Sequence, residues 1–294
     1  MGFLRCASCE DFWFKGVDVN LFSQFQWNVP CQPLSFLIYR LVFALYQIGW
    51  NIAIITVWGD PRFYRPVDSK AKWPIYASNW ALMFFSLYCF TALITAISLA
   101  KRNGGVQATE AIEMEPSKTG KGDVDLDPEE QMKPVSLPWF VKVTWFLQVT
   151  SYSVTLFVSV AYWLIDFDPE VEHASIFTIH THAISSVLVL LDMALVATPC
   201  RWTHFFFGTI FGLSYFVFTF VYYVLGGYNP YGEKFIYQSM VDWEDKPVVS
   251  LVAAILVSFL VAPLFHLFFF GIYKLKIFIH SRTQQHVRKS NFSN

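Results

Sequence analysis

The sequence contains little charge. Asp, Glu, Lys and Arg together make up 15% of its 294 residues, whereas 55% are hydrophobic and 19% are aromatic. Soluble domains usually carry about 25% charged residues, so this composition disfavours a soluble globular fold. The formal net charge of −1 gives no electrostatic basis for binding nucleic acid. The composition therefore indicates a membrane protein that is in contact with the lipid bilayer.

Several motifs with known chemistry are also missing. The chain has no P-loop, no Rossmann glycine pattern, no HExxH sequence and no internal repeat. Its five cysteines are an odd number, which excludes a complete disulfide framework. Cys6 and Cys9 form a CxxC without a second ligand pair, so we expect no metal and no cofactor. If these two thiols face the cytosol, S-acylation is one expectation and two free thiols is the other.

The sequence contains six long apolar runs. Each is long enough to cross a bilayer as a helix, which needs about 20 residues. The expected fold class is therefore all-α: a polytopic membrane helical bundle with six transmembrane helices. Gly208 and Gly212 form a GxxxG pair, which we expect to pack inside the bundle. The runs cover residues 34–57, 74–100, 138–165, 175–198, 204–225 and 248–272.

These runs divide the chain into three parts. Residues 1–33 form an N-terminal segment without a secretory signal, since the first apolar run begins only at Leu34. Residues 34–272 form the six-helix transmembrane domain. Within it, residues 101–137 are acidic, aperiodic and rich in Gly and Pro, which predicts a disordered loop. Residues 273–294 form a basic tail.

The distribution of basic residues predicts the orientation. The N-terminal segment, the 101–137 loop and the tail carry the larger share of Lys and Arg, so both termini are expected to be cytosolic. Arg40 and Lys142 lie near span ends on this side and are expected to snorkel to its surface. The tail, with Lys274 and Lys276, is expected to lie against anionic lipid. Whether the membrane is the plasma membrane or an endomembrane stays open.

The fourth run is unusually polar for a membrane span. Ionisable residues at such depth are costly and indicate a function by default. His182 lies roughly 10 Å below the non-cytosolic surface, by the helical rise of about 1.5 Å per residue. The second run enters from the same side, where Tyr76, Ser78 and Asn79 lie about 3–8 Å deep. The fourth run contains His180, His182, Ser185, Ser186 and Asp192.

Two further placements follow from helix geometry. His180 is two residues from His182 and is expected to point roughly the opposite way. Asp192 lies roughly 15 Å further along the helix and on another face, so it cannot orient the His182 ring. The acids expected near the outer mouth of the bundle are Asp166, Asp168, Glu170 and Glu172.

Four segments of the sequence resemble the rolling stone family of multipass membrane proteins. They are KWPIYASNWAL (72–82), HAISSVLVLLDMAL (182–195), FIYQSMVDWEDKP (235–247) and SQFQW (23–27). The resemblance covers nearly all of the chain outside the acidic loop and the tail. It implies a role in myoblast fusion, with which the family is associated in flies.

That family is in turn distantly similar to the androgen-induced and androgen-dependent TFPI-regulating proteins. These are intramembrane hydrolases that cleave fatty acid esters of hydroxy fatty acids with one Thr and one His. Carried over by motif, their His falls on His182 and their Thr falls on Ser78. The family usually reads Tyr-Leu-Thr before Asn/His-Trp, whereas this chain reads Tyr-Ala-Ser-Asn-Trp from Tyr76 to Trp80. The serine keeps a nucleophilic hydroxyl.

Three functions follow as hypotheses. The first is an intramembrane hydrolase of a lipid ester substrate, with Ser78 as nucleophile, His182 as general base, and Tyr76 and Asn79 as oxyanion donors. The second is a non-enzymatic protein for cell recognition or fusion, with membrane protein partners, in which the same residues only join helices. The third, a haem electron carrier, is disfavoured because it needs facing histidine pairs, and only His266 lies deep in another span.

Overall fold

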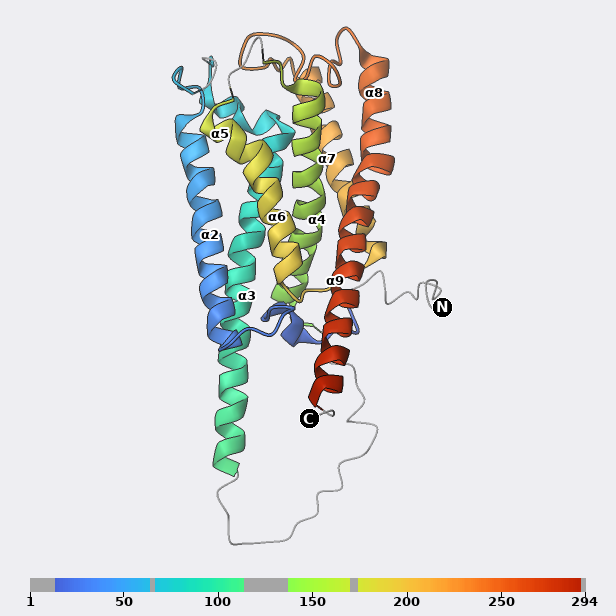
Figure 1. The fold of residues 1–294 in the computed structure, drawn as a ribbon. Coiled ribbons are helices and arrows are strands. Elements are labelled where there is room, and N and C mark those ends of the chain that lie inside the picture. The colour runs from blue at the N-terminus through green and yellow to red at the C-terminus, as the bar shows by residue number, and fades with distance from the viewer. Residues whose placement is uncertain (1–13, 64–66, 114–136, 170–173, 292–294) are drawn as a thin grey trace.

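The structure is a computed structural model that describes residues 14–63, 67–113, 137–169 and 174–291. Its helices run side by side in one bundle (Figure 1). Six of them are long and apolar enough to cross a membrane, which confirms the predicted all-α, six-helix fold class. The α-helices are α2 (Gln32–Val57), α3 (Ala77–Glu113), α4 (Trp139–Ala161), α5 (Ile176–Ile179), α6 (Ser185–Leu195), α7 (Phe205–Val224), α8 (Pro247–Leu256) and α9 (Ala262–Asn291).

Three of the six spans contain a π-helical turn. The segment η4 (Tyr162–Asp166) ends the α4 span, η5 (His180–Ile184) joins α5 to α6, and η7 (Val257–Val261) joins α8 to α9. Such turns leave backbone carbonyls without their usual α-helical partners and often occur at functional sites. Short 3₁₀ turns complete the chain: η1 (Val19–Phe22), η2 (Lys70–Ile75) and η6 (Trp202–His204).

Three of the helices have a proline at or next to their first residue. Pro33 occupies the first turn of α2, Pro138 is the N-cap of α4, and Pro247 is the first residue of α8. A missing N–H has no consequence at these positions, because the first turn has no intrahelical acceptor for it. The outer faces of the helices expose large apolar side chains, among them Leu45 and Val217. An exposed apolar surface of this extent fits lipid.

The glycine pair of α7 packs within the bundle, as predicted. A Cβ atom added to Gly208 would lie 3.4 Å from the Cβ of Ala262. A Cβ added to Gly212 would lie 2.8 Å from the hydroxyl of Ser258 and 3.2 Å from its Cα. Two small residues thus let α7 approach η7 and the start of α9 closely.

Arg40 does not snorkel, so that prediction was wrong. Its side chain is 2% exposed, and its guanidinium Nη1 lies 2.9 Å from the Oδ1 of Asp192, which is fully buried. The hydroxyls of Tyr39, Tyr88 and Tyr152 also donate to this carboxylate. Burying the Arg40 charge is tolerated because it is paired with an opposite charge. That partner, Asp192, lies 152 residues away in the sequence.

The described part of the N-terminal segment folds under the same end of the bundle. The SQFQW element pairs with the end of α6: the N–H of Gln26 donates to Leu195, and the N–H of Ala197 donates to Gln24. The indole of Trp27 donates to the carbonyl of Ala194 at 2.9 Å. This family motif therefore fixes the end of the polar fourth span.

Two of the predicted boundaries differ from the structure. The helix α3 continues to Glu113, so the start of the 101–137 segment is helical rather than disordered, while residues 114–136 lie outside the described residues. The basic tail continues α9 as far as Asn291. Lys276 does not face lipid: it is 4% exposed and donates to the carbonyls of Met193 and Val196, at the end of α6. Cationic groups are stabilising at such a helix end.

Candidate functional site

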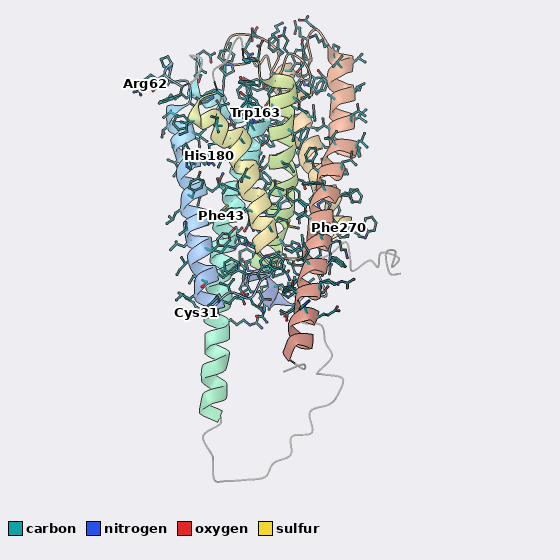
Figure 2. The ribbon with its side chains drawn as sticks, in the orientation of Figure 1. Cys31, Phe43, Arg62, Trp163, His180 and Phe270 are labelled. Carbon is teal, nitrogen blue, oxygen red and sulfur yellow. The ribbon has the colours of Figure 1, made fainter. Side chains whose placement is uncertain are left out.

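A cavity of about 410 Å³ lies at the end of the bundle opposite the described N-terminal residues. Figure 2 marks the two ends by Cys31 and Arg62, with His180 in the half nearer Arg62. The cavity is lined by the end of α2, the start of α3, α4 with η4, α5 with η5, α7, η7 and the loop that follows α7. Its volume is in the range of small-molecule and lipid sites.

Ser78 lies in the first turn of α3, where it lines the cavity. The turn η2 precedes it, and two side chains of α3 hold that turn in place. The amide of Asn79 donates to the carbonyl of Trp73 at 2.6 Å, and the indole of Trp80 donates to the carbonyl of Pro74 at 2.6 Å. The Y-A-S-N-W sequence is thus folded back on the turn that leads into it, which fixes Ser78 at the cavity wall.

His182 lies in the π-helical segment η5 and also lines the cavity. Its imidazole stacks on the ring of Tyr162, with centroids 3.7 Å apart and planes 9° apart. The indole of Trp163 donates to the His182 carbonyl at 2.8 Å, and the Ser185 hydroxyl donates to the His180 carbonyl at 2.9 Å. The His180 carbonyl also accepts the backbone N–H of Ser185, so Ser185 bonds it twice, while Trp163 ties the π turn to the neighbouring α4 span.

The imidazole of His182 has spare hydrogen-bonding capacity. The residue is 9% exposed, and among the described residues no side chain or backbone group bonds to its Nδ1 atom. A buried nitrogen without a partner costs about 1–3 kcal/mol, and this Nδ1 has no accessible surface through which a ligand in the cavity could reach it.

His180 points away from this cavity, as predicted. Its ring stacks on Trp50 of α2, with centroids 4.5 Å apart and planes 13° apart. His266 bonds to the carbonyl of Arg201 at 2.7 Å. These partners leave no facing pair among His180, His182 and His266, the three histidines considered from the sequence. Among the described residues, no group of three His, Cys, Asp or Glu side chains has metal-site geometry.

The loop after α7 forms the roof of the cavity, and sequence reasoning assigned no role to its residues. Tyr237 accepts a hydrogen bond from the N–H of Ala77 at 3.0 Å, which caps the start of α3. Burial, and after it the charge of Asp166, raises the pKa of Tyr237 above its ordinary value, while hydrogen bonds with Ala77, Tyr215 and Ser78 act in the opposite direction. Of the sequence features, only the resemblance of FIYQSMVDWEDKP to the rolling stone family could have indicated that this loop belongs to the site.

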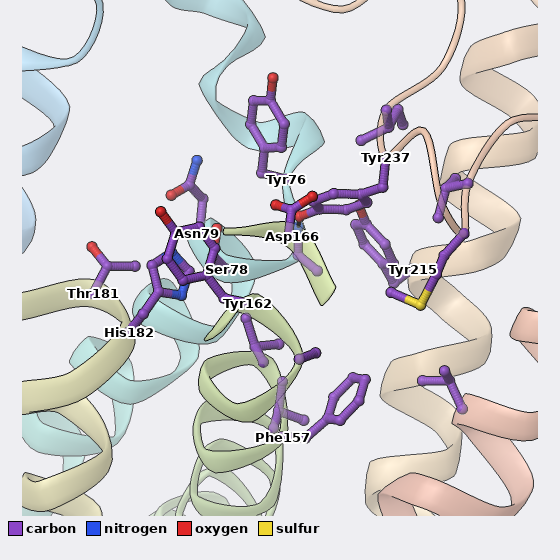
Figure 3. A pocket seen from close by; sticks show the side chains of 18 of the residues that line it. Tyr76, Ser78, Asn79, Phe157, Tyr162, Asp166, Thr181, His182, Tyr215 and Tyr237 are labelled. Atoms are coloured by element: carbon purple, nitrogen blue, oxygen red, sulfur yellow. Dashed lines mark hydrogen bonds between the residues drawn. The ribbon is translucent and has the colours of Figure 1, made fainter. Parts of the chain in front are cut away.

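The four residues chosen from the sequence all line this one cavity: Ser78, His182, Tyr76 and Asn79. Figure 3 shows them with Asp166, Tyr162 and Tyr237 around the same space. No hydrogen bond joins the side chains of Ser78 and His182 in the described structure, and catalytic bonds of this kind often tighten only with substrate.

The acids of the outer mouth divide into two groups. Asp166 lines the cavity and Asp168 does not, while Glu170 and Glu172 lie outside the described residues. Asp192 belongs to the buried cluster at the other end, which agrees with the prediction that it does not orient His182.

Comparison with known proteins places the chain in a family. Residues 3–290 match the family described as "Protein rolling stone". The chain belongs to the rolling stone family. It is 26% identical over 275 residues to Protein rolling stone of Drosophila melanogaster, an alignment that covers 90% of this chain and 86% of the fly protein. No solved structure matches it. The resemblance predicted from four short segments is confirmed, and the chain is a multipass membrane protein of this family.

Three of the four rolling stone segments meet at the cavity. The 72–82 segment contributes Tyr76 and Ser78, the 182–195 segment contributes His182, and the 235–247 segment contributes Tyr237. The SQFQW segment lies at the other end of the bundle, where it holds α6. Three of the segments that carry the resemblance therefore contribute to the cavity wall, and the fourth packs against the far end of the span that contains His182.

Proposed function

We propose that this rolling stone family protein hydrolyses lipid esters inside the membrane, with Ser78 as the nucleophile and His182 as the general base. The observation that carries the proposal is the meeting of these two side chains, from different helices, at the wall of one cavity with an apolar interior. A serine hydroxyl is a weak nucleophile at neutral pH and needs such a base. The setting suits a substrate that enters from the bilayer.

The chemistry balances with water as the only co-reactant. The Ser78 oxygen attacks the ester carbonyl carbon while His182 takes the hydroxyl proton. The tetrahedral intermediate then collapses, the bond to the alcohol oxygen breaks, and His182 returns the proton to that oxygen. Water, deprotonated by His182, attacks the acyl-serine, and the release of the fatty acid restores the Ser78 hydroxyl.

The developing oxyanion needs hydrogen-bond donors, and the start of α3 has several. One N–H of the Asn79 amide is bonded to Trp73, which leaves its second N–H as a candidate. The hydroxyl of Tyr76 and the backbone N–H of Ser78 are further candidates, whereas the N–H groups of Ala77, Asn79 and Trp80 are bonded within the protein. In other hydrolases one such donor contributes about 3–4 kcal/mol to the transition state.

The test is covalent labelling of the full-length protein in membranes with a long-chain fluorophosphonate. The proposal expects labelling of the wild type, and at least a tenfold loss, or about 1.4 kcal/mol, in Ser78→Ala and in His182→Ala. His180→Ala is the matched control: it removes a buried imidazole two residues away that faces Trp50, and labelling should persist. Thermal unfolding of each variant separates lost chemistry from lost folding.

The same contacts also fit a second proposed function, in which the protein has no enzymatic activity. In a non-enzymatic protein for cell recognition or fusion, Ser78 and Tyr237 would hold the roof loop on α3 and His182 would join η5 to η4. The wild type would then take no label and hydrolyse no ester. Folded Ser78→Ala and His182→Ala variants would in that case lose only thermal stability.

A further inference from the structure

The cavity continues past Ser78 and His182 into an apolar slot that runs along the spans. At the level of these two residues its lining includes the polar side chains of Tyr76, Asn79 and Tyr237. Further into the bundle the lining changes to apolar residues of α4, α7, η7 and the start of α9. Six of these are Val154, Phe157 and Val158 on α4 and Gly208, Phe211 and Gly212 on α7. The proposed chemistry therefore lies at a polar mouth, above an apolar interior.

Two helices indicate the depth of the slot. On α7, the Tyr215 hydroxyl donates to the carbonyl of Ile75 at 2.8 Å, which places Tyr215 near the start of α3. Gly208 lies seven residues before Tyr215, or about 10 Å further into the bundle at a rise of about 1.5 Å per residue. On α4, Tyr162 stacks on the proposed general base, and Val154 lies eight residues before it, or about 12 Å deeper. Both helices thus extend the apolar lining about 10–12 Å below the proposed catalytic pair.

The inner end of the slot is closed by packed side chains. One turn beyond Gly208, the ring of His204 is fully buried. It packs against three aromatic rings at centroid distances of 5.1, 5.0 and 5.4 Å, those of Phe14, Trp145 and Phe207. On α4, residues 147–153 are all buried, and none of them lines the cavity. A chain that enters from the mouth therefore meets a closed end.

The order of events in ester hydrolysis decides which part of a substrate can occupy a closed slot. In the proposed mechanism the alcohol leaves first, while the acyl group stays bonded to Ser78 until water attacks. An alcohol held in the slot would have to pass the acyl-serine on its way out. An alcohol at the mouth departs directly and makes way for water. The acyl chain is the part that can remain in the slot throughout.

We infer that the acyl chain of the substrate lies in the slot between α4 and α7, with the alcohol at the mouth, and that Val158 and Val154 determine how long a chain fits. The substrate class is then an ester whose acyl part is a hydrocarbon chain. This inference rests on the proposed function, because the assignment of acyl and alcohol follows from the order in which they leave.

The two valines act at different depths. Val158 lies one turn nearer the mouth than Val154, since four residues of helix rise about 6 Å. An extended hydrocarbon chain advances about 1.2 Å per bond, as the length of an extended backbone implies. One helical turn therefore corresponds to about five carbons of chain. A chain that arrives from the bilayer is already in an apolar medium, so the slot selects chains by space and not by hydrophobicity.

Chain length is tested on full-length protein in membranes with alkyl fluorophosphonates of increasing length. Val158→Phe should slow labelling by about tenfold or more for every chain long enough to meet the new ring. Val154→Phe should tolerate chains about five carbons longer before labelling falls. The control is Val160→Phe on the same helix: Val160 is 38% exposed and does not line the cavity, so labelling should match the wild type at every length.

Folding is checked by thermal unfolding of each variant. Val154 packs in a cluster with Ala81 and Phe211, so the milder Val154→Leu is measured beside Val154→Phe. A wild-type length dependence in the folded Val158 and Val154 variants would overturn the inference. The same change in Val160→Phe as in Val158→Phe would also overturn it, because the slot would then not set the limit.

The position of the chain is mapped on full-length Ser78→Ala protein in nanodiscs, so that no ester is consumed. One ester carries a photoactivatable group at the end of its acyl chain, and a second carries it equally far along its alcohol chain. The acyl probe should cross-link to Val154, Phe157 or Phe211 at least about tenfold more than the alcohol probe. Equal cross-linking, the reverse preference, or acyl cross-links confined to lipid-facing residues such as Val160 would overturn the inference.

The two proposals fail separately. Acyl cross-links in the slot of Ser78→Ala, with no labelling or hydrolysis by the wild type, would overturn the proposed hydrolase alone. Labelling of Ser78 with the alcohol probe in the slot, or with an unchanged length dependence in the slot variants, would overturn the acyl-chain inference alone.

Discussion

The imidazole of His182 lies flat on the ring of Tyr162, with ring centroids 3.7 Å apart and planes 9° apart. The two residues come from different spans, and each lies in a π-helical turn. The stacking fixes the plane of an imidazole that no described acid orients. In the proposed hydrolase, Tyr162 would take the place that a carboxylate holds in many hydrolases, with the ring plane set by packing instead of by charge.

Tyr162 is accordingly expected to act as a positioning residue. Tyr162→Phe keeps the stacked ring and should retain fluorophosphonate labelling within about threefold of the wild type. Tyr162→Leu removes it and should slow labelling by about tenfold or more, equivalent to about 1.4 kcal/mol in the barrier. The measurement is the labelling rate at several probe concentrations, which separates the maximal rate from probe affinity. Equal loss in both variants would point to the hydroxyl and would contradict a role for the stacked ring.

The pair of Arg40 and Asp192 is expected to be essential for stability. Arg40→Ala leaves a buried carboxylate without its cation, a change that typically costs about 3–5 kcal/mol. Thermal unfolding in detergent should show a large fall in melting temperature. The control is Arg62→Ala, whose pair with Asp60 is exposed to water, so this variant should melt close to the wild-type temperature.

Charge removal from both partners sharpens this test. The double variant Arg40→Met with Asp192→Leu leaves no unpaired ion, so it should be more stable than Arg40→Ala alone. If Arg40→Ala has the same melting temperature as the wild type, the buried ion pair does not contribute to stability.

Lys276 should behave differently from its near neighbour Lys274. Lys276→Met removes the ammonium that bonds to Met193 and Val196, and should destabilise the protein by about 1–3 kcal/mol, since two carbonyls lose a charged donor. Lys274→Met changes an exposed side chain and should stay within about 0.5 kcal/mol. Melting temperatures of the two variants side by side provide the measurement. Equal effects would indicate that Lys276 serves only as tail charge.

Both termini are proposed to face the cytosol. Six spans put the two ends on one side, and the described N-terminal residues pack against the end of α6 beside Lys276 of α9. Tags at the N- and C-termini should both survive protease added to sealed cells and should both be cut after permeabilisation. Removal of either tag from intact cells would reverse or break this topology.

The spans could be predicted because lipid imposes a simple rule on sequence. A chain in hydrocarbon must satisfy its backbone internally and present apolar side chains, and both demands are visible in a run of about 20 residues. The partner of Arg40 could not be predicted in this way, because it lies 152 residues away. The same holds for Lys276, whose acceptors are carbonyls that become available only where α6 ends.

The candidate site was predictable as far as depth is set by helical rise. The positions of Ser78 and His182 along their spans brought them to one level, and both line the same cavity. Tyr162 and Tyr237 could not be found by that argument. The first depends on two π turns that have no local sequence signature, and the second lies in a loop whose path over the bundle is set by tertiary contacts.

The central claim is tested most directly by locating the covalent adduct after fluorophosphonate treatment of the wild-type protein. Peptide mass spectrometry should find the phosphonyl group on Ser78, and the adduct should be absent from His182→Ala protein that still unfolds at the wild-type temperature. An unmodified Ser78 in wild-type protein that is otherwise folded, or an adduct on another residue, would contradict the claim.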